Sequence, residues 1–177
     1  MKPMTINTFS LAAADGLKLS GRAWRPAEPT AAVCLIHGLG EHSGRYDHVG
    51  EAFAARGVAL VATDLRGHGL SEGRRGHAKS YAVLMDDVSL LLKTARERDP
   101  ALPLFLYGHS LGGNLALHYL VERKPSLAGA IVTSPLLRLA LAPPIGRTRL
   151  LKLMKRAGLE ISMPSGLNDK ELSRDVN

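Results

Sequence analysis

Residues 102–113 read LPLFLYGHSLGG, an apolar strand that turns into a helix through a serine flanked by glycines. The run from Leu102 to Tyr107 is short and apolar, which is typical of a buried strand. The helix that follows carries its apolar residues at helical spacing and ends at Lys124-Pro125. A serine held on so sharp a bend projects its hydroxyl above the sheet, so Ser110 is a candidate nucleophile.

The pattern Gly-x-Ser-x-Gly at 108–112 is weak by itself, because it arises by chance in roughly one such chain in ten. The alternative is a plain turn in which Ser110 caps the helix. That alternative needs no second glycine-rich loop at the same edge of the sheet. The position of the match between a strand and a helix therefore favours a nucleophile over a cap.

Strands and helices alternate through most of the chain. The expected strands are 6–12, 17–24, 32–36, 58–63, 102–107 and 128–133, and the expected helices are 46–56, 81–99 and 111–123. Asp15-Gly16 predicts a tight hairpin between the first two strands. The later alternation predicts an α/β fold with a mostly parallel sheet and helices on both faces. Residues 1–135 form this core, and 136–177, which are basic and broken by prolines, form a separate helical region.

Length and composition restrict the classes that remain. The chain has 177 residues, a net charge of +7 and 45% apolar residues, enough for one packed core. Cys34 is the only cysteine, which excludes internal disulfides and favours a reducing, cytoplasmic compartment. No apolar run is long enough to span a membrane, and no secretory signal is visible. The charge is too diffuse to favour nucleic acid as a partner.

A second glycine-rich loop, His37-Gly38-Leu39-Gly40, follows the strand 32–36. Parallel strands place their carboxyl ends at one edge of a sheet, so this loop and the Ser110 bend should meet there. Acyl transfer requires two N–H donors aimed at the developing oxyanion, and the amides of Leu39 and Leu111 are the candidates. The residues expected to shape these two loops are His37, Gly38, Gly108, His109 and Gly112.

Further polar residues gather in the same loops: His42 near the first, and Asp64, Arg66 and His68 after the fourth strand. We interpret them as hydrogen-bond partners of irregular backbone rather than as catalysts. Their spacing fits no metal site, and no phosphate-binding signature stands at the right place, so neither a metal nor a cofactor is expected.

Three motifs, HGLGEHSGRY at 37–46, DLRGHGLSEG at 64–73 and GHSLGG at 108–113, resemble the monoacylglycerol lipase branch of the α/β-hydrolase fold. The resemblance implies Ser110 as nucleophile and the amides of Leu39 and Leu111 as oxyanion hole. It also implies that the region after Pro135 begins a cap. That cap would shape an acyl-chain channel, with Leu136 and Leu137 as candidate lining residues, and would touch a membrane surface.

The general base is missing from the expected place. The triad partners in this fold follow the serine in the order acid, then histidine. His118 is the only histidine after Ser110 and lies eight residues along the next helix, about 12 Å of rise away. The available acids, Asp169 and Asp175, fall in the cap-like tail. We therefore expect the last third of a complete enzyme, with its acid and histidine, to lie outside this chain.

Folding predicts the same incompleteness, because the strand at 128–133 would leave an apolar edge unpaired. Three interpretations remain open: a fragment of a longer hydrolase, one half of a split enzyme whose remainder is a second polypeptide, or a domain that folds alone and hydrolyses nothing. The first two favour a missing C-terminal segment as partner.

The leading functional prediction is a serine hydrolase of carboxylic esters with monoacylglycerols as substrates. A lysophospholipase, a carboxylesterase and an aminopeptidase are the alternatives within the fold. A non-catalytic lipid-binding module is the alternative from another class. Residues 147–156 carry five cations with leucines between them, which suits an interfacial helix near anionic lipids as well as a solvated basic face.

Overall fold

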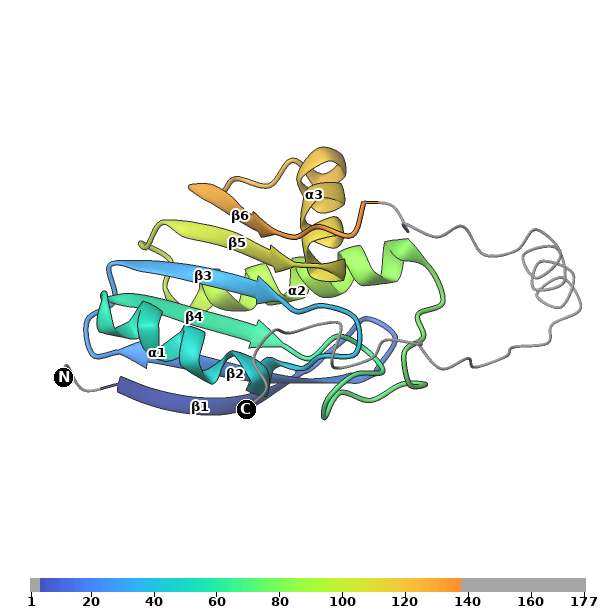
Figure 1. Cartoon of the computed structure of the whole chain (residues 1–177), viewed down its shortest axis with the longest axis horizontal. Helices are drawn as coiled ribbons and strands as arrows, with labels where there is room; N and C mark the ends of the chain where they lie inside the picture. Colours follow the sequence, from blue (N-terminus) through green and yellow to red (C-terminus); the bar gives the residue numbers. More distant parts are fainter. Residues whose placement is uncertain (1–3, 138–177) are drawn as a thin grey trace, which may run out of the picture. The chain divides into compact units, whose positions relative to one another are not determined.

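The computed structural model describes residues 4–137, which form one six-stranded sheet with three α-helices (Figure 1). The strands are β1 (Met4–Ala12), β2 (Lys18–Pro26), β3 (Ala31–Ile36), β4 (Val58–Thr63), β5 (Leu104–His109) and β6 (Gly129–Thr133). The helices are α1 (Asp47–Ala55), α2 (Tyr81–Arg98) and α3 (Leu111–Arg123), with a 3₁₀ turn, η1 (Ser43–Tyr46), before α1.

The order of strands across the sheet is β1-β2-β4-β3-β5-β6. β1 pairs with β2 and β2 pairs with β4 in antiparallel fashion, whereas β3 pairs with β4, β5 with β3 and β6 with β5 in parallel. The N-terminal hairpin turns at Gly16, whose φ of 82° is the left-handed conformation that the turn requires. The predictions of an opening hairpin and a mostly parallel sheet are confirmed.

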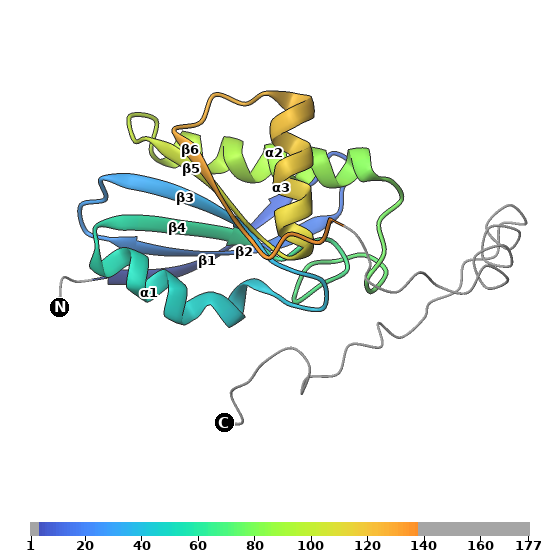
Figure 2. The same ribbon diagram turned by 45° about the horizontal axis from the view of Figure 1, so that its top comes forward.

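Helices cover both faces of the sheet, as predicted: α1 lies on one face, and α2 and α3 lie on the other (Figure 2). Under α1, the fully buried Trp24 packs with Val33, Leu35 and Leu60. A Cβ atom added to Gly50 would lie 2.2 Å from Cγ of Trp24, so α1 can reach the sheet because position 50 lacks a side chain. A larger apolar cluster fills the space between the sheet and the other two helices.

One boundary differs in a way that matters for the site. The fifth strand was expected to end at Tyr107, but β5 runs to His109. Gly108 pairs with both Ile36 and Val132, and His109 pairs with Thr133, so neighbouring strands on both sides extend the ladder. The chain therefore changes direction within a single residue, Ser110.

β6 is the last strand of the sheet in the part of the chain that the structure describes, and Ile131 is exposed on it. The edge predicted to need a partner is thus open within residues 4–137. The region expected to form a cap lies, from residue 138 onward, outside the described residues. Within the described range, none of the helices combines the length and the apolar character that crossing a membrane would require.

Candidate active site

Ser110 occupies a strained bend between β5 and α3. Its φ of 54° and ψ of −114° lie where residues with a Cβ atom are rare, at a cost of about 1–3 kcal/mol. Backbone hydrogen bonds hold it there: the Ser110 N–H donates to Thr133 O at 3.0 Å, and its carbonyl oxygen accepts from the N–H groups of Asn114 at 3.1 Å and Leu136 at 2.9 Å. The alternative in which Ser110 caps the helix is wrong, because its side chain makes no cap hydrogen bond.

Close contacts between glycines and backbone bring the two predicted loops together. A Cβ atom on Gly108 would lie 2.3 Å from the carbonyl oxygen of Gly112. A Cβ atom on Gly38 would lie 3.1 Å from Cβ of Ser110, so the loop after β3 rests directly against the serine. The expectation that both loops share one edge of the sheet agrees with these contacts.

His37 is buried and fixes the backbone of the loop after β3. Its Nε2 accepts a hydrogen bond from the N–H of Leu65 at 2.8 Å, so the proton of the neutral ring is on Nδ1, which donates to Gly38 O at 2.7 Å. Burial lowers the pKa of His37 to about 4, which keeps the ring neutral. This residue shapes the loop and leaves neither ring nitrogen free for proton transfer to a substrate.

The hydrogen bond to Gly38 O also orients the next amide. The carbonyl of Gly38 and the N–H of Leu39 belong to one planar trans peptide and point in opposite directions. Within residues 4–137, neither the Leu39 N–H nor the Leu111 N–H has a hydrogen-bond acceptor. The amide of Leu111 is the first of α3, where the helix dipole adds positive potential. Both amides are thus available to an anionic oxygen.

The loop between β4 and α2 supports the site through buried polar side chains. Asp64 accepts hydrogen bonds from the N–H groups of Ser43 at 2.6 Å and Leu70 at 2.8 Å. Burial raises the pKa of the Asp64 carboxyl, but these hydrogen bonds outweigh it and the net pKa is lowered. Arg66 is buried in an ion pair with Asp87, and the buried His68 ring packs in an edge-to-face arrangement with the ring of His37, with centroids 5.5 Å apart.

His109 and His118 both lie away from the serine hydroxyl. Nδ1 of His109 is 2.9 Å from Thr133 Oγ1, so the ring is turned toward β6. On α3, His118 faces Glu122, with Nε2 to Oε1 at 3.3 Å, and packs edge-on against Tyr81. Among the residues the structure describes, no histidine after Ser110 in the chain is placed to accept its proton, and no cluster of His, Cys, Asp or Glu could hold a metal ion.

Leu136 and Leu137 fall at the end of the described region. Leu136 lies beside the serine, since its N–H donates to Ser110 O and its carbonyl accepts from Asn114 Nδ2 at 2.8 Å. Leu137 is exposed. A role for either in an acyl-chain channel stays a prediction.

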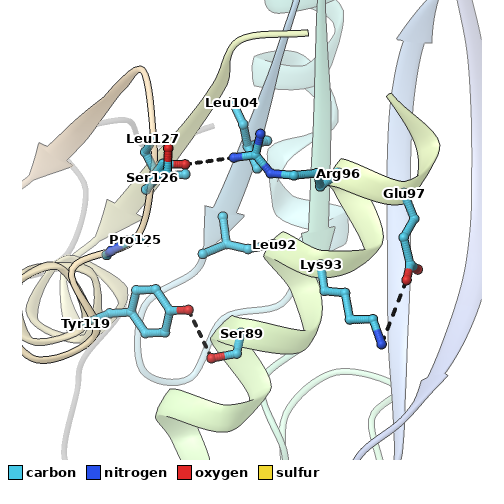
Figure 3. A pocket seen from close by; sticks show the side chains of 10 residues that line it. All are labelled: Ser89, Leu92, Lys93, Arg96, Glu97, Leu104, Tyr119, Pro125, Ser126 and Leu127. Carbon is cyan, nitrogen blue, oxygen red and sulfur yellow. Dashed lines mark hydrogen bonds and ion pairs between the residues drawn. The ribbon is translucent and has the colours of Figure 1, made fainter. Parts of the chain in front are cut away.

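An open hollow of about 540 Å³ lies between α2 and α3, but it is not this site (Figure 3). Its lining includes Leu104, at the opposite end of β5 from the serine, and Leu127. A hydrogen bond of 2.9 Å between Ser89 and Tyr119 joins the two helices across it. None of the candidate residues at the edge of the sheet contributes to it.

Sequence reasoning missed one residue of the site, Glu41. Its Oε2 accepts hydrogen bonds from the Gly38 N–H and from the Tyr46 hydroxyl, both at 2.8 Å. Spacing could not reveal these bonds, because they depend on the conformation of the loop.

A mixed sheet with helices on both faces and a serine on the bend between β5 and α3 defines an α/β hydrolase. The comparison with known proteins makes this specific: the chain belongs to the family described as serine aminopeptidase, S33, which it matches over residues 27–177.

Individual relatives agree with that assignment. An abhydrolase domain-containing protein of Dictyostelium discoideum is 49% identical over 140 residues, covering 78% of this chain and 15% of that protein. The human monoglyceride lipase is 36% identical over 153 residues, covering 86% of this chain and 49% of the lipase. The crystal structure of a Paleococcus ferrophilus monoacylglycerol lipase has a TM-score of 0.71 and 30% identity, covering 98% of this chain and 59% of that one. The chain thus spans about half the length of the lipase relatives it matches.

Proposed function

We propose that this chain is the nucleophile-bearing part of a serine hydrolase of carboxylic esters, with monoacylglycerols as the substrate class. The observation that carries the proposal is the strained bend at Ser110, with Gly38 packed against the serine and two amides without acceptors in the described region. The similarity to monoacylglycerol lipases supports the choice of substrate.

In the proposed reaction, Ser110 Oγ attacks the ester carbonyl carbon. The carbonyl oxygen becomes negative and accepts hydrogen bonds from the N–H groups of Leu39 and Leu111. A histidine supplied by polypeptide outside this chain takes the serine proton and gives it to the departing glycerol oxygen, which leaves an acyl-enzyme. Water then attacks the acyl carbon and gives a proton to the same histidine, which protonates Ser110 Oγ as its bond to the acyl carbon breaks and the fatty acid is released.

The experiment uses the chain as it stands and measures covalent modification of Ser110 by a fluorophosphonate, read as a mass increase of the intact protein. Free imidazole replaces the absent base. We expect slow modification without imidazole, a rate that rises with imidazole concentration, and none in Ser110→Ala. A wild-type chain that stays unmodified with imidazole, and also when combined with a C-terminal polypeptide that carries the acid and the histidine, contradicts the proposal and favours the non-catalytic lipid-binding module.

The substrate class needs a second measurement. With a C-terminal polypeptide that carries the acid and the histidine, the assembled enzyme should hydrolyse monoacylglycerols faster than lysophospholipids, short-chain esters or aminoacyl anilides. Preference for one of the other three would assign the corresponding activity: lysophospholipase, carboxylesterase or aminopeptidase.

The basic segment 147–156, which lies outside the described residues, supports a further part of the proposal: a cytoplasmic protein that touches membrane surfaces reversibly. Sedimentation with vesicles tests it. Binding to vesicles rich in anionic lipid that weakens with salt is expected, and equal binding to zwitterionic vesicles contradicts an electrostatic contact.

A further inference from the structure

We propose that Glu41 is a positioning residue that closes the loop carrying the Leu39 amide and ties that loop to the protein core. This inference rests on the proposed function, because it assigns Leu39 to the oxyanion hole. Glu41 itself touches no reacting atom in this scheme.

Glu41 holds Gly38 from two sides. Its backbone N–H points to Gly38 O at 3.4 Å, which closes a four-residue turn, Gly38 to Glu41. Gly40 is the third residue of the turn and has a φ of 73°, the conformation that a type II turn requires there. The carboxylate of Glu41 then folds back and accepts the Gly38 N–H at 2.8 Å. Leu39 lies at the tip of this closed turn, and its own N–H has no acceptor among residues 4–137.

The carboxylate is itself anchored. Its Oε2 also accepts the hydroxyl of Tyr46 at 2.8 Å, and Tyr46 is buried in the apolar cluster that contains Trp24 and Leu35. Arg45 is more distant, with Nη1 to Oε1 at 3.7 Å, and is mostly exposed. Burial raises the pKa of the Glu41 carboxyl, but the hydrogen bonds from Tyr46 and Gly38 outweigh it and lower the net pKa, so the group is ionised at neutral pH.

Together with His37, these contacts determine the direction of the Leu39 N–H. His37 binds the carbonyl of Gly38 and Glu41 binds its N–H, so the peptides on both sides of Gly38 are fixed. The peptide that includes Gly38 O also includes the Leu39 N–H, which must then point away from His37. A donor fixed in advance needs no rearrangement when the oxyanion forms.

The charge of Glu41 and its hydrogen-bonding oxygen make separate contributions. A negative charge beside Ser110 opposes the formation of an oxyanion, so the benefit of Glu41 must come from the backbone it holds. Glu41→Gln keeps an oxygen at the Oε2 position and removes the charge, whereas Glu41→Ala removes both. If Glu41 were instead a base for Ser110, the glutamine and alanine variants would be equally impaired.

The test compares the wild-type chain with three variants: Glu41→Ala, Glu41→Gln and, as a control, Glu97→Ala. Glu97 is an exposed carboxylate on α2 whose oxygen is 3.8 Å from Lys93 Nζ. Two quantities are measured for each protein: the imidazole-dependent rate of Ser110 modification by a fluorophosphonate, and hydrogen exchange of the Gly38 and Leu39 amides by NMR.

We expect Glu41→Ala to slow the modification by about 10- to 100-fold, less than the complete loss of an oxyanion donor, and to accelerate exchange at Gly38. Glu41→Gln should stay within about threefold of the wild type for both, since a neutral acceptor is weaker than a charged one but still pairs. Glu97→Ala should change neither quantity.

Three outcomes overturn the inference. Unchanged Gly38 exchange in Glu41→Ala would show that the carboxylate does not hold the loop. Equal loss of modification in the glutamine and alanine variants would assign a role to the charge. An unchanged rate of Ser110 modification in Glu41→Ala, while the wild type reacts, would show that the conformation of the loop does not affect the reaction. A wild-type chain that does not react counts against the proposed function alone, and hydrogen exchange then decides whether Glu41 holds the loop.

Discussion

The carbonyl oxygen of Ile36 occupies the space that a side chain at Gly112 would need. A Cβ atom added to Gly112 would lie 2.0 Å from that oxygen and 2.6 Å from the carbonyl oxygen of His37. Both are backbone atoms at or just after the end of β3, so neither can rotate away. The first turn of α3 therefore contacts the end of β3 only while position 112 has no side chain.

Gly112→Ala should lower the free energy of unfolding by about 2–3 kcal/mol, because the backbone has to separate. The sign is diagnostic, since alanine in a helix is otherwise favoured over glycine by about 1 kcal/mol. Urea unfolding measures the change. Gly113→Ala is the matched control: its Cβ would lie 3.1 Å from Cα of Pro135, a milder contact, so a smaller loss is expected. If Gly112→Ala were as stable as the wild type, the contact would not be required.

Strain at Ser110 gives a second prediction. Glycine adopts positive φ without steric cost, whereas alanine keeps the Cβ atom that makes the bend unfavourable. Ser110→Gly should therefore be more stable than Ser110→Ala by about 1 kcal/mol. The measurement is the urea unfolding midpoint of the two variants. Equal midpoints would mean that the relief of strain is no larger than the extra conformational entropy that glycine loses on folding.

The buried neutral ring of His37 predicts a pH dependence of stability. Folding lowers the pKa of His37 from its ordinary value of 6.5 to about 4. As the pH falls below 6.5, His37 binds a proton in the unfolded chain but not in the folded protein. The free energy of unfolding therefore decreases until about pH 4. The total loss from this group is at most about 3 kcal/mol.

His37→Asn isolates this contribution. Asparagine keeps an N–H donor near Gly38 O but loses the acceptor for the Leu65 N–H, so the variant should be less stable than the wild type at pH 7. The difference should shrink as the pH falls toward 4, because only the wild type loses the His37 contribution. Urea unfolding at several pH values measures it. Parallel curves for the two proteins would show that His37 does not titrate on unfolding.

Two adjacent aspartates on α2 allow a buried ion pair to be compared with an exposed one. Asp87 accepts two hydrogen bonds from Arg66, at 2.6 and 2.7 Å, and both side chains are 5% exposed. Asp86 pairs with Arg123 at 2.8 Å, where about half of each side chain is exposed. Asp87→Ala leaves a buried guanidinium without this partner and should cost about 3–5 kcal/mol. Asp86→Ala should cost less than about 1 kcal/mol in the same unfolding experiment. Similar losses in both would mean that Arg66 is solvated after the substitution.

Much of the fold could be predicted from periodicity and turn residues. The buried strands, the hairpin at Asp15-Gly16 and the helices on both faces each have a local signal that tertiary packing reinforces. The apolar pattern ends at Tyr107, two residues before the end of β5, because Gly108 and His109 extend the strand only through their pairing with β3 and β6. The order of strands across the sheet has no local signal and came from the structure alone.

The candidate site, like the fold, could be predicted from the sequence only in part. That the loops at His37 and Ser110 meet at one edge follows from the parallel strands, so sequence reasoning could anticipate it. The hydrogen bonds of Glu41 depend on the turn that Gly40 closes, and the neutral state of His37 depends on burial. Neither property can be obtained from spacing, because the bonds of Glu41 require a particular conformation of the loop and the burial of His37 requires contacts with residues distant in the sequence, such as Leu65.

Two hydrogen bonds connect Leu136 to the bend at Ser110 and the first turn of α3. Its N–H donates to the carbonyl oxygen of Ser110, and its own carbonyl oxygen accepts from the side chain of Asn114. The chain thus leaves the sheet at a point that is hydrogen-bonded to Ser110 and to α3. Because these bonds fix the chain at Leu136, we expect the position of Ser110 to be independent of the length and composition of the sequence that follows Leu137.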